Sequence, residues 1–268
     1  GITNYIINDS TFNDRTEKVK LLADIVECLP FEVNFSAYIR IDLLVRFPEQ
    51  VPLLKKARVW AHWYGTETFH PDAAKAIGKG MPSEHIKQGM IDTRKYFLNE
   101  LGLYRGHSSL IAGLPYESSS SWESTEEWHL ENFNDQSRCW FSLELPDTDA
   151  PEVEHSVFTK NLSKYGMRKM QDKERINSLK LEGYKSANYS MPWEHDTVDL
   201  LDAWIFKAKF DKNVLPNLPV NTFSIIPLTK FLDNRDLLSY TNKDHRIGSI
   251  NNNIQHDYIK NKKKYLDI

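Results

Sequence analysis

Residues 58–101 read RVWAHWYGTETFHPDAAKAIGKGMPSEHIKQGMIDTRKYFLNEL. The first seven, residues 58–64, are dominated by aromatic and other apolar side chains, which is typical of a buried strand. A short helix is expected over 70–77, where Gly78 supplies the usual C-terminal signal, and a long helix over 83–101. A strand followed by helices is the unit from which parallel sheets are built, because the crossover returns the chain to the same edge.

The same unit recurs on both sides of this segment. The predicted strands are 2–7, 31–38, 58–64, 109–114 and 138–145, and the predicted helices are 14–27, 48–56, 70–77, 83–101 and 121–132. This alternation predicts an α/β fold with parallel strands, either an open doubly wound sheet or a (β/α) barrel. In both folds, functional residues gather at the C-terminal ends of the strands.

The composition changes after residue 145. Residues 147–154 are acidic, a helix is expected over 197–210, and no β-α rhythm is visible. We therefore expect a barrel over 1–145 and an extension over 146–268 that covers it.

Composition and charge narrow the class of protein. The chain has 268 residues, 40% hydrophobic, and a formal net charge of −3, so neither nucleic acid nor an anionic membrane is an expected partner. No apolar run approaches the roughly 20 residues of a membrane span, and no secretory leader is recognisable, so we expect a cytoplasmic protein. Two cysteines, Cys28 and Cys139, exclude a disulfide framework or a cysteine-based zinc site, and both are expected to be buried.

The C-terminal part contains two weaker signals. The spacing of His155, Glu194 and His195 matches no metal-ligand pattern, so no metal site is expected there. The three lysines at 262–264 are expected to be solvated rather than to bind nucleic acid.

Polar and glycine-containing motifs follow the predicted strands. They are Asn8-Asp9-Ser10-Thr11-Phe12, Arg40-Ile41-Asp42, Gly65-Thr66-Glu67-Thr68, Ile77-Gly78-Lys79-Gly80 and Gly113-Leu114-Pro115-Tyr116-Glu117. Each alone has a structural explanation as a turn, a surface ion pair or a helix end. At strand ends, however, Gly65 would allow close approach of a ligand that Glu67 faces, and Gly113 would leave its backbone open to that ligand.

In this order and spacing, the motifs resemble the radical S-adenosylmethionine (SAM) superfamily, especially the branch related to cobalamin-binding and methylthiolating enzymes. The resemblance covers about residues 1–145. It implies a partial parallel (β/α)₆ TIM-like barrel that binds SAM across its strand ends. It also implies a [4Fe–4S] cluster for reductive SAM cleavage, hydrogen abstraction from an unknown substrate, and a reductase or flavodoxin-like electron donor.

The resemblance also implies cofactor-binding residues. The matching positions are Asn8, Asp9, Arg40, Glu67, Lys79, Ile111, Gly113 and Leu114. The Asn8–Asp9 turn matches the site that binds the SAM amino group. Glu67 matches a position near the ribose or the amino-acid part of SAM. Lys79 matches the basic residue that pairs with the SAM carboxylate, and Arg40 would assist it. The stretch beside the adenine is matched by Ile111, Gly113 and Leu114. A zwitterion requires both signs of charge nearby, and an adenine requires an apolar shelf with exposed amides.

The sequence departs from the family in one major respect. The Cys-x-x-x-Cys-x-x-Cys motif that holds the cluster is absent, and it is expected on the loop after a strand that precedes Ile2. We therefore expect a barrel fragment that lacks its first strand and is inactive alone. Asn8 and Thr68 also stand where Asp and Ser are frequent.

Two other functions fit parts of the pattern. Glu67 and Glu117, both at predicted strand ends, would suit the carboxylate pair of a barrel hydrolase. A barrel without a cluster would instead serve as a binding or scaffold protein.

Overall fold

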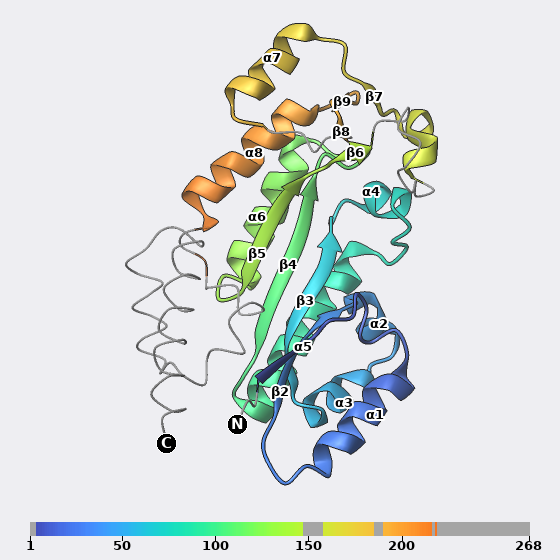
Figure 1. Ribbon diagram of the computed structural model, residues 1–268, viewed down its shortest axis with the longest axis vertical. Helices are drawn as coiled ribbons and strands as arrows, with labels where there is room; N and C mark the ends of the chain where they lie inside the picture. Colours follow the sequence, from blue (N-terminus) through green and yellow to red (C-terminus); the bar gives the residue numbers. More distant parts are fainter. Residues whose placement is uncertain (1–3, 147–157, 185–189, 216–217, 219–268) are drawn as a thin grey trace, which may run out of the picture.

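A five-stranded parallel sheet is the centre of the computed structural model, which describes residues 4–146, 158–184, 190–215 and 218. The strands are β1 (Asn4–Ile7), β2 (Asn34–Ile39), β3 (Val59–Glu67), β4 (Arg105–Ala112) and β5 (Ser137–Ser142). They lie in the order β1-β2-β3-β4-β5, and every neighbouring pair is parallel. This confirms the predicted α/β class and the sheet of a partial TIM-like barrel (Figure 1).

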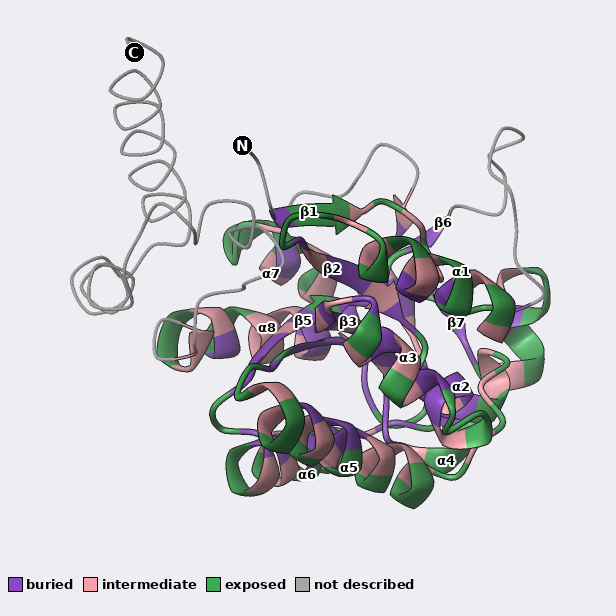
Figure 2. Ribbon diagram, turned by 90° about the horizontal axis from the view of Figure 1, so that it is seen from below, coloured by how far each residue is buried: buried purple, intermediate pink, exposed green. Residues whose placement is uncertain are grey.

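Helices connect and cover these strands. They are α1 (Thr16–Glu27), α2 (Ile41–Arg46), α3 (Gln50–Lys56), α4 (Pro71–Ala76), α5 (Ser83–Leu101) and α6 (Ser119–Asn132). One buried cluster joins β2 and β3 to α1, α3 and α5 through residues such as Val19, Leu54 and Phe97. In Figure 2 the buried colour is concentrated on the central strands and on the helix faces turned toward them, whereas the middle of β1 is exposed. Burial of one helix stripe and one sheet face is the main stabilising contribution in such a layer.

The C-terminal part adds small elements at the same end of the sheet as α4 (Figure 1). They are β6 (Leu145–Pro146), η1 (Thr159–Tyr165), β7 (Arg168–Lys169), α7 (Lys173–Leu181), β8 (Ser190–Met191), β9 (Trp193–Glu194) and α8 (Leu200–Asn213). Strand β6 pairs antiparallel with β8, and β7 pairs antiparallel with β9. Helix α8 packs on β4 and β5, so Phe210 shares a buried cluster with Leu110 and Trp140.

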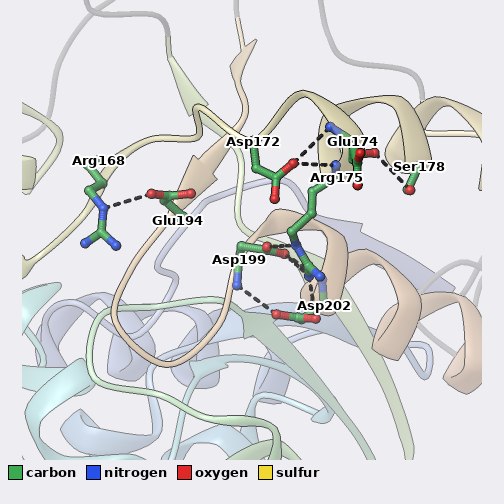
Figure 3. Close-up of polar contacts among 8 residues, drawn as sticks. All are labelled: Arg168, Asp172, Glu174, Arg175, Ser178, Glu194, Asp199 and Asp202. Atoms are coloured by element: carbon green, nitrogen blue, oxygen red, sulfur yellow. Dashed lines mark hydrogen bonds and ion pairs between the residues drawn. The ribbon is translucent and has the colours of Figure 1, made fainter.

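An ion-pair network joins α7 to α8 (Figure 3). The Arg175 guanidinium donates to Asp199 and to Asp202, with Nη2 2.8 Å from an oxygen of each. Asp199 also caps α8, because its side chain accepts from the Asp202 amide. Arg168 of β7 donates to Glu194 of β9 over 2.8 Å. Asp199 is buried and Arg175 is partly exposed, so this pair ties α7 to the start of α8. The more exposed pair of Arg168 with Glu194 contributes little individually.

Several predicted boundaries were wrong for identifiable reasons. Strand β4 ends at Ala112 rather than at 114, because Gly113 has a φ of +103° and turns the chain. Strand β3 continues past Tyr64 to Glu67. Strand β5 ends at Ser142. Helix α2 was not predicted, although it directly follows β2.

The cysteines also differ from expectation. Cys28 is exposed at the C-terminal end of α1, where the helix no longer faces the core, and Cys139 on β5 is half-buried. His155 and the lysines at 262–264 lie outside the described residues. None of the helices in the described ranges combines the length and the apolar character of a membrane span.

Candidate functional site

A cleft of about 700 Å³ lies at the C-terminal ends of the sheet strands. Every strand or the segment after it contributes to the wall: Thr11 after β1, Arg40 after β2, Glu67 on β3, Ile111 on β4 and Phe141 on β5. The volume is within the range of sites that hold a cofactor or substrate. The position is also where parallel α/β folds carry their functional residues.

Charged groups of both signs meet on one side of the cleft. The Lys79 ammonium lies 3.7 Å from Glu67 Oε1 and donates to the Gly65 carbonyl oxygen. A Cβ atom at residue 65 would lie 2.9 Å from Glu67 Oε1, so a side chain at this position would require the Glu67 carboxylate to shift. Desolvation lowers the pKa of Lys79, while the Glu67 and Asp42 carboxylates act in the opposite direction. The result is a cation and a carboxylate held close together beside an open volume.

Arg40 also lies on this charged side of the cleft, and hydrogen bonds to its backbone hold it in place. The Asn13 side chain accepts from the Arg40 amide over 2.8 Å and donates to the Arg40 carbonyl over 3.0 Å. The Arg40 guanidinium pairs with Asp42, which raises the pKa of Arg40. The surface ion pair considered from the sequence is therefore present, and the same arginine also lines the cleft.

Glu67 adopts an unusual backbone conformation. Its φ is +64°, and the pairing of β3 with β4 is irregular between Gly65 and Glu67. A non-glycine residue in this region costs about 1–2 kcal/mol relative to glycine. Strain of this kind is found at functional sites more often than elsewhere.

We expect Glu67→Gly to raise the free energy of unfolding by about 1 kcal/mol, because glycine adopts a positive φ without strain. Urea denaturation of the variant and the parent measures this. Glu123→Gly, in the exposed middle of α6, is the control and should lower stability by about 1 kcal/mol. A loss of stability in the Glu67→Gly variant would show that the Glu67 carboxylate contributes more free energy to folding than its backbone strain costs.

The remaining wall of the cleft is apolar and aromatic. Tyr38, Trp63, Ile111 and Phe141 line it, together with the Ser109 hydroxyl. Sequence reasoning did not single out Tyr38, Trp63, Ser109 or Phe141. The available signal was the period of two along a strand: each of the pairs 38/40, 63/65 and 109/111 places two residues on one face of the sheet.

Of the eight residues predicted to bind the cofactor, the cleft brings together Arg40, Glu67, Lys79 and Ile111. Asn8 is exposed and is not among the lining residues, although Ser10 and Thr11 of the same turn are. The Asp9 carboxylate lies 2.6 Å from the Lys18 ammonium, which lowers the pKa of Asp9. Asp9 is therefore engaged in fixing its own turn.

Gly113 and Leu114 are also outside the lining, and the expectation of an open backbone at Gly113 was wrong. The amides of both residues donate to Glu117 Oε2, each over 3.1 Å. The same carboxylate accepts from the Thr68 hydroxyl over 2.6 Å and from Trp122 Nε1 over 2.8 Å. No sequence motif indicates this set of hydrogen bonds, because Glu117 joins the ends of two different strands.

Glu117 is unsuited to the hydrolase function considered above. Its side chain is buried, does not line the cleft, and already accepts four hydrogen bonds. Burial raises its pKa to about 7, although the four donors act in the opposite direction. A glycosidase pair needs both carboxylates at the substrate. Of Glu67 and Glu117, only Glu67 lines the cleft, where the second carboxylate is Glu144.

The residues present fit SAM better than they fit an iron–sulfur cluster. The cleft has an ammonium and a carboxylate, which suit the zwitterionic end of SAM, and Ile111 offers an apolar surface for its planar base. A [4Fe–4S] cluster is held by thiolates. Cys28 is on the C-terminal end of α1 and Cys139 on β5, and no three His, Cys, Asp or Glu side chains converge among the described residues.

Comparison with known proteins supports the fold. No family model matches the chain, and no curated protein matches it in sequence. Among solved structures, it is similar to the radical S-adenosylmethionine methyltransferase TsrM from Kitasatospora setae, whose structure has cobalamin and a [4Fe–4S] cluster bound. The TM-score is 0.55 at 11% identity, over 96% of this chain and 53% of that one.

A second match is coproporphyrinogen III oxidase (HemN) from Escherichia coli, a radical SAM enzyme. It has a TM-score of 0.39 at 14% identity, over 74% of this chain and 54% of that one. This score is too low to establish a common fold, so the likeness rests on TsrM. The chain spans about half the length of each of these two proteins.

Proposed function

We propose that this chain is the SAM-binding core of a radical SAM enzyme. The observation that carries the proposal is the meeting of Arg40, Glu67 and Lys79 in one cleft at the C-terminal edge of a parallel sheet. These residues are separated in sequence by up to 39 positions, and the family resemblance assigns all three to the cofactor independently of the geometry. The fold shared with a radical SAM methyltransferase supports the same assignment.

The proposed roles follow from charge and position. Lys79 pairs with the SAM carboxylate, and Arg40 adds positive charge on the same side. Glu67 accepts from the amino group or the ribose hydroxyls. Ile111 provides an apolar surface beside the adenine. Because Asp9 is occupied by Lys18, we assign the polar contacts of the first turn to Ser10 and Thr11, which line the cleft.

The proposed activity requires two partners that this chain does not supply. SAM bound to a reduced [4Fe–4S] cluster supplies reductive cleavage and hydrogen abstraction in this superfamily. These 268 residues contain two cysteines, fewer than the three thiolates of a cluster site, so the proposal places the cluster ligands on another segment or chain. An electron donor of the reductase or flavodoxin type belongs to the same proposal.

The first test is SAM affinity. We expect Glu67→Ala and Lys79→Met each to weaken SAM binding about ten- to a hundredfold, because a hydrogen bond to a charged group contributes about 1.5–3 kcal/mol. Calorimetric titration of each variant measures this. Glu123→Ala, at an exposed position of α6, is the matched control and should bind like the parent. Parent-like affinity in both cleft variants would remove the charged side from the SAM site.

The second test concerns iron. After anaerobic reconstitution with iron and sulfide, this chain is expected to bind no [4Fe–4S] cluster, because three neighbouring thiolates are lacking. Iron analysis and absorption spectroscopy measure this. About four irons per chain with a thiolate-bound cluster spectrum would contradict the prediction. SAM binding without iron, even when a segment with the three-cysteine motif is fused upstream, would favour the scaffold function instead.

A further inference from the structure

Three aromatic side chains, Tyr38, Trp63 and Phe141, line the cleft away from its charged side, and we call them the aromatic lining. Tyr38 and Trp63 are register neighbours on β2 and β3, and their ring centroids are 5.5 Å apart. The Trp63 ring also contacts its register neighbour on β4, His107, with ring centroids 4.1 Å apart. Phe141 on β5 is 48% exposed, unlike the fully covered aromatic side chains of the core.

Tyr38 and Trp63 lie deeper along the strands than the charged groups, whereas Phe141 lies level with its register neighbour Ile111 near the strand ends. Trp63 precedes Glu67 by four residues on β3, which is roughly 13 Å at about 3.3 Å per residue. Tyr38 likewise precedes Arg40 by two residues, or about 7 Å. The cleft therefore has a charged rim, suited to the zwitterionic end of SAM, and an aromatic interior that this end does not need.

One polar group belongs to the aromatic lining. Trp63 Nε1 donates to Ser109 Oγ over 2.6 Å, and an indole nitrogen can only donate. The Ser109 oxygen therefore acts as the acceptor, and its own hydrogen remains to be donated. Its other polar contact among the described residues is the Cys139 thiol, which donates weakly to the same oxygen over 4.0 Å and so does not use the hydroxyl hydrogen. An oxygen or nitrogen acceptor on a ligand in the cleft could accept that hydrogen.

We propose that the aromatic lining binds a second ligand beside SAM: a planar, uncharged aromatic heterocycle whose acceptor atom receives the Ser109 hydroxyl hydrogen. This inference rests on the proposed function, because it assigns the charged rim and Ile111 to SAM. Aromatic rings bind planar heterocycles by stacking, and each stacked ring contributes about 1–3 kcal/mol. The second ligand is then the substrate, or the reacting part of it.

The test uses two probes that differ by one acceptor atom. Benzimidazole has a ring nitrogen that accepts a hydrogen bond, and indole has a carbon at that position. Each is titrated into the SAM-saturated chain by calorimetry, with the parent and three variants: Phe141→Leu, Ser109→Ala and Phe31→Leu. Phe31 is 54% exposed outside the cleft and is the matched control for Phe141.

We expect Phe141→Leu to weaken both probes about tenfold. Ser109→Ala should weaken benzimidazole about three- to tenfold and leave indole unchanged, since a neutral hydrogen bond contributes about 0.5–1.5 kcal/mol. Phe31→Leu should change neither probe. SAM affinity should remain within about twofold of the parent in all three variants.

Different results overturn different assignments. If benzimidazole and SAM exclude one another and adenosine displaces benzimidazole, the aromatic lining holds the adenine of SAM and the second-ligand inference is wrong. The same conclusion follows if probe binding is independent of Phe141 while SAM binds normally. If SAM does not bind the parent chain, the proposed function fails; benzimidazole binding that still depends on Phe141 and Ser109 would then show that the aromatic lining is a site in its own right.

Discussion

Replacement of Gly113 by alanine is expected to lower the free energy of unfolding by about 3–5 kcal/mol, the largest effect of any glycine substitution in the described chain. A Cβ atom at this position would lie 2.1 and 2.3 Å from two ring carbons of Trp193, far inside contact distance. Gly113 also has a φ of +103°, which side chains rarely adopt. Overpacking of a buried site costs about 1–3 kcal/mol, and a disallowed φ costs about 1–3 kcal/mol.

Substitutions of two other glycines distinguish the steric clash from the backbone strain. Gly102 has a φ of +65° and no atom within 4 Å of the place that a Cβ atom would occupy, so Gly102→Ala reports backbone strain alone. Gly80 has neither a positive φ nor a close neighbour, so Gly80→Ala should be nearly neutral. Urea denaturation of the three variants measures the series. A Gly113→Ala variant no less stable than Gly102→Ala would mean that Trp193 can move aside, and that β9 is not held against the end of β4.

Replacement of Glu117 by alanine is expected to cost about 3–6 kcal/mol. Alanine would leave four donors without their acceptor: the Thr68 hydroxyl, Trp122 Nε1 and the amides of Gly113 and Leu114. Each buried group left unsatisfied costs about 1–3 kcal/mol, less where water enters. Because Glu117 joins the ends of β3 and β4, the variant should also weaken SAM binding at the neighbouring cleft.

Glu117→Gln is the matched comparison and should cost only about 1–2 kcal/mol. The glutamine oxygen can still accept from the two amides and from Trp122, and its NH₂ group can donate to the Thr68 oxygen. Chemical denaturation and SAM titration of both variants measure the contrast. Equal losses for glutamine and alanine would show that the charge of Glu117, rather than its hydrogen bonding, holds the two strand ends together.

The stability of the protein should also depend on pH through Glu117. Its pKa is raised from 4.5 to about 7, chiefly by burial. The folded state therefore binds a proton that the unfolded state has released between these pH values, so this contribution to stability falls as pH rises from about 4.5 to about 7 and is constant above. One pKa unit corresponds to about 1.4 kcal/mol, so the total change is about 3 kcal/mol. The stability difference between parent and Glu117→Gln, measured across this range, should follow that slope; a flat difference would mean that the four donors keep Glu117 ionised throughout.

The order and direction of the strands could be predicted from the sequence because the signals are local. Each strand is an apolar run of the right length, and each crossover has a helical period or a capping residue. The predicted strand 58–64 and helix 83–101 are examples. The structure confirms a strand and a helix there, although β3 ends three residues later than predicted. Helix α2 was missed because a six-residue helix has too little periodicity to separate it from the preceding strand.

The candidate site could be predicted only in part. Arg40, Glu67 and Lys79 were identified because a strand-end position and a charge are both readable in the sequence, and the parallel order of the strands brings such ends together. Tyr38, Trp63 and Phe141 were missed because an aromatic residue inside a strand has the same sequence pattern whether it faces the core or a cleft.

What the sequence alone determined was therefore the five strands of the sheet, their order and direction, and the edge of the sheet at which function is expected. Only the tertiary structure decided which strand-end groups are free to meet a ligand. The amides of Gly113 and Leu114 are occupied by Glu117, and Asp9 by Lys18, while Lys79 remains beside the open cleft. The physical reason is competition for hydrogen-bond partners: a buried carboxylate takes the nearest donors, and Thr68, 49 residues away, is among those donors only after the chain has folded.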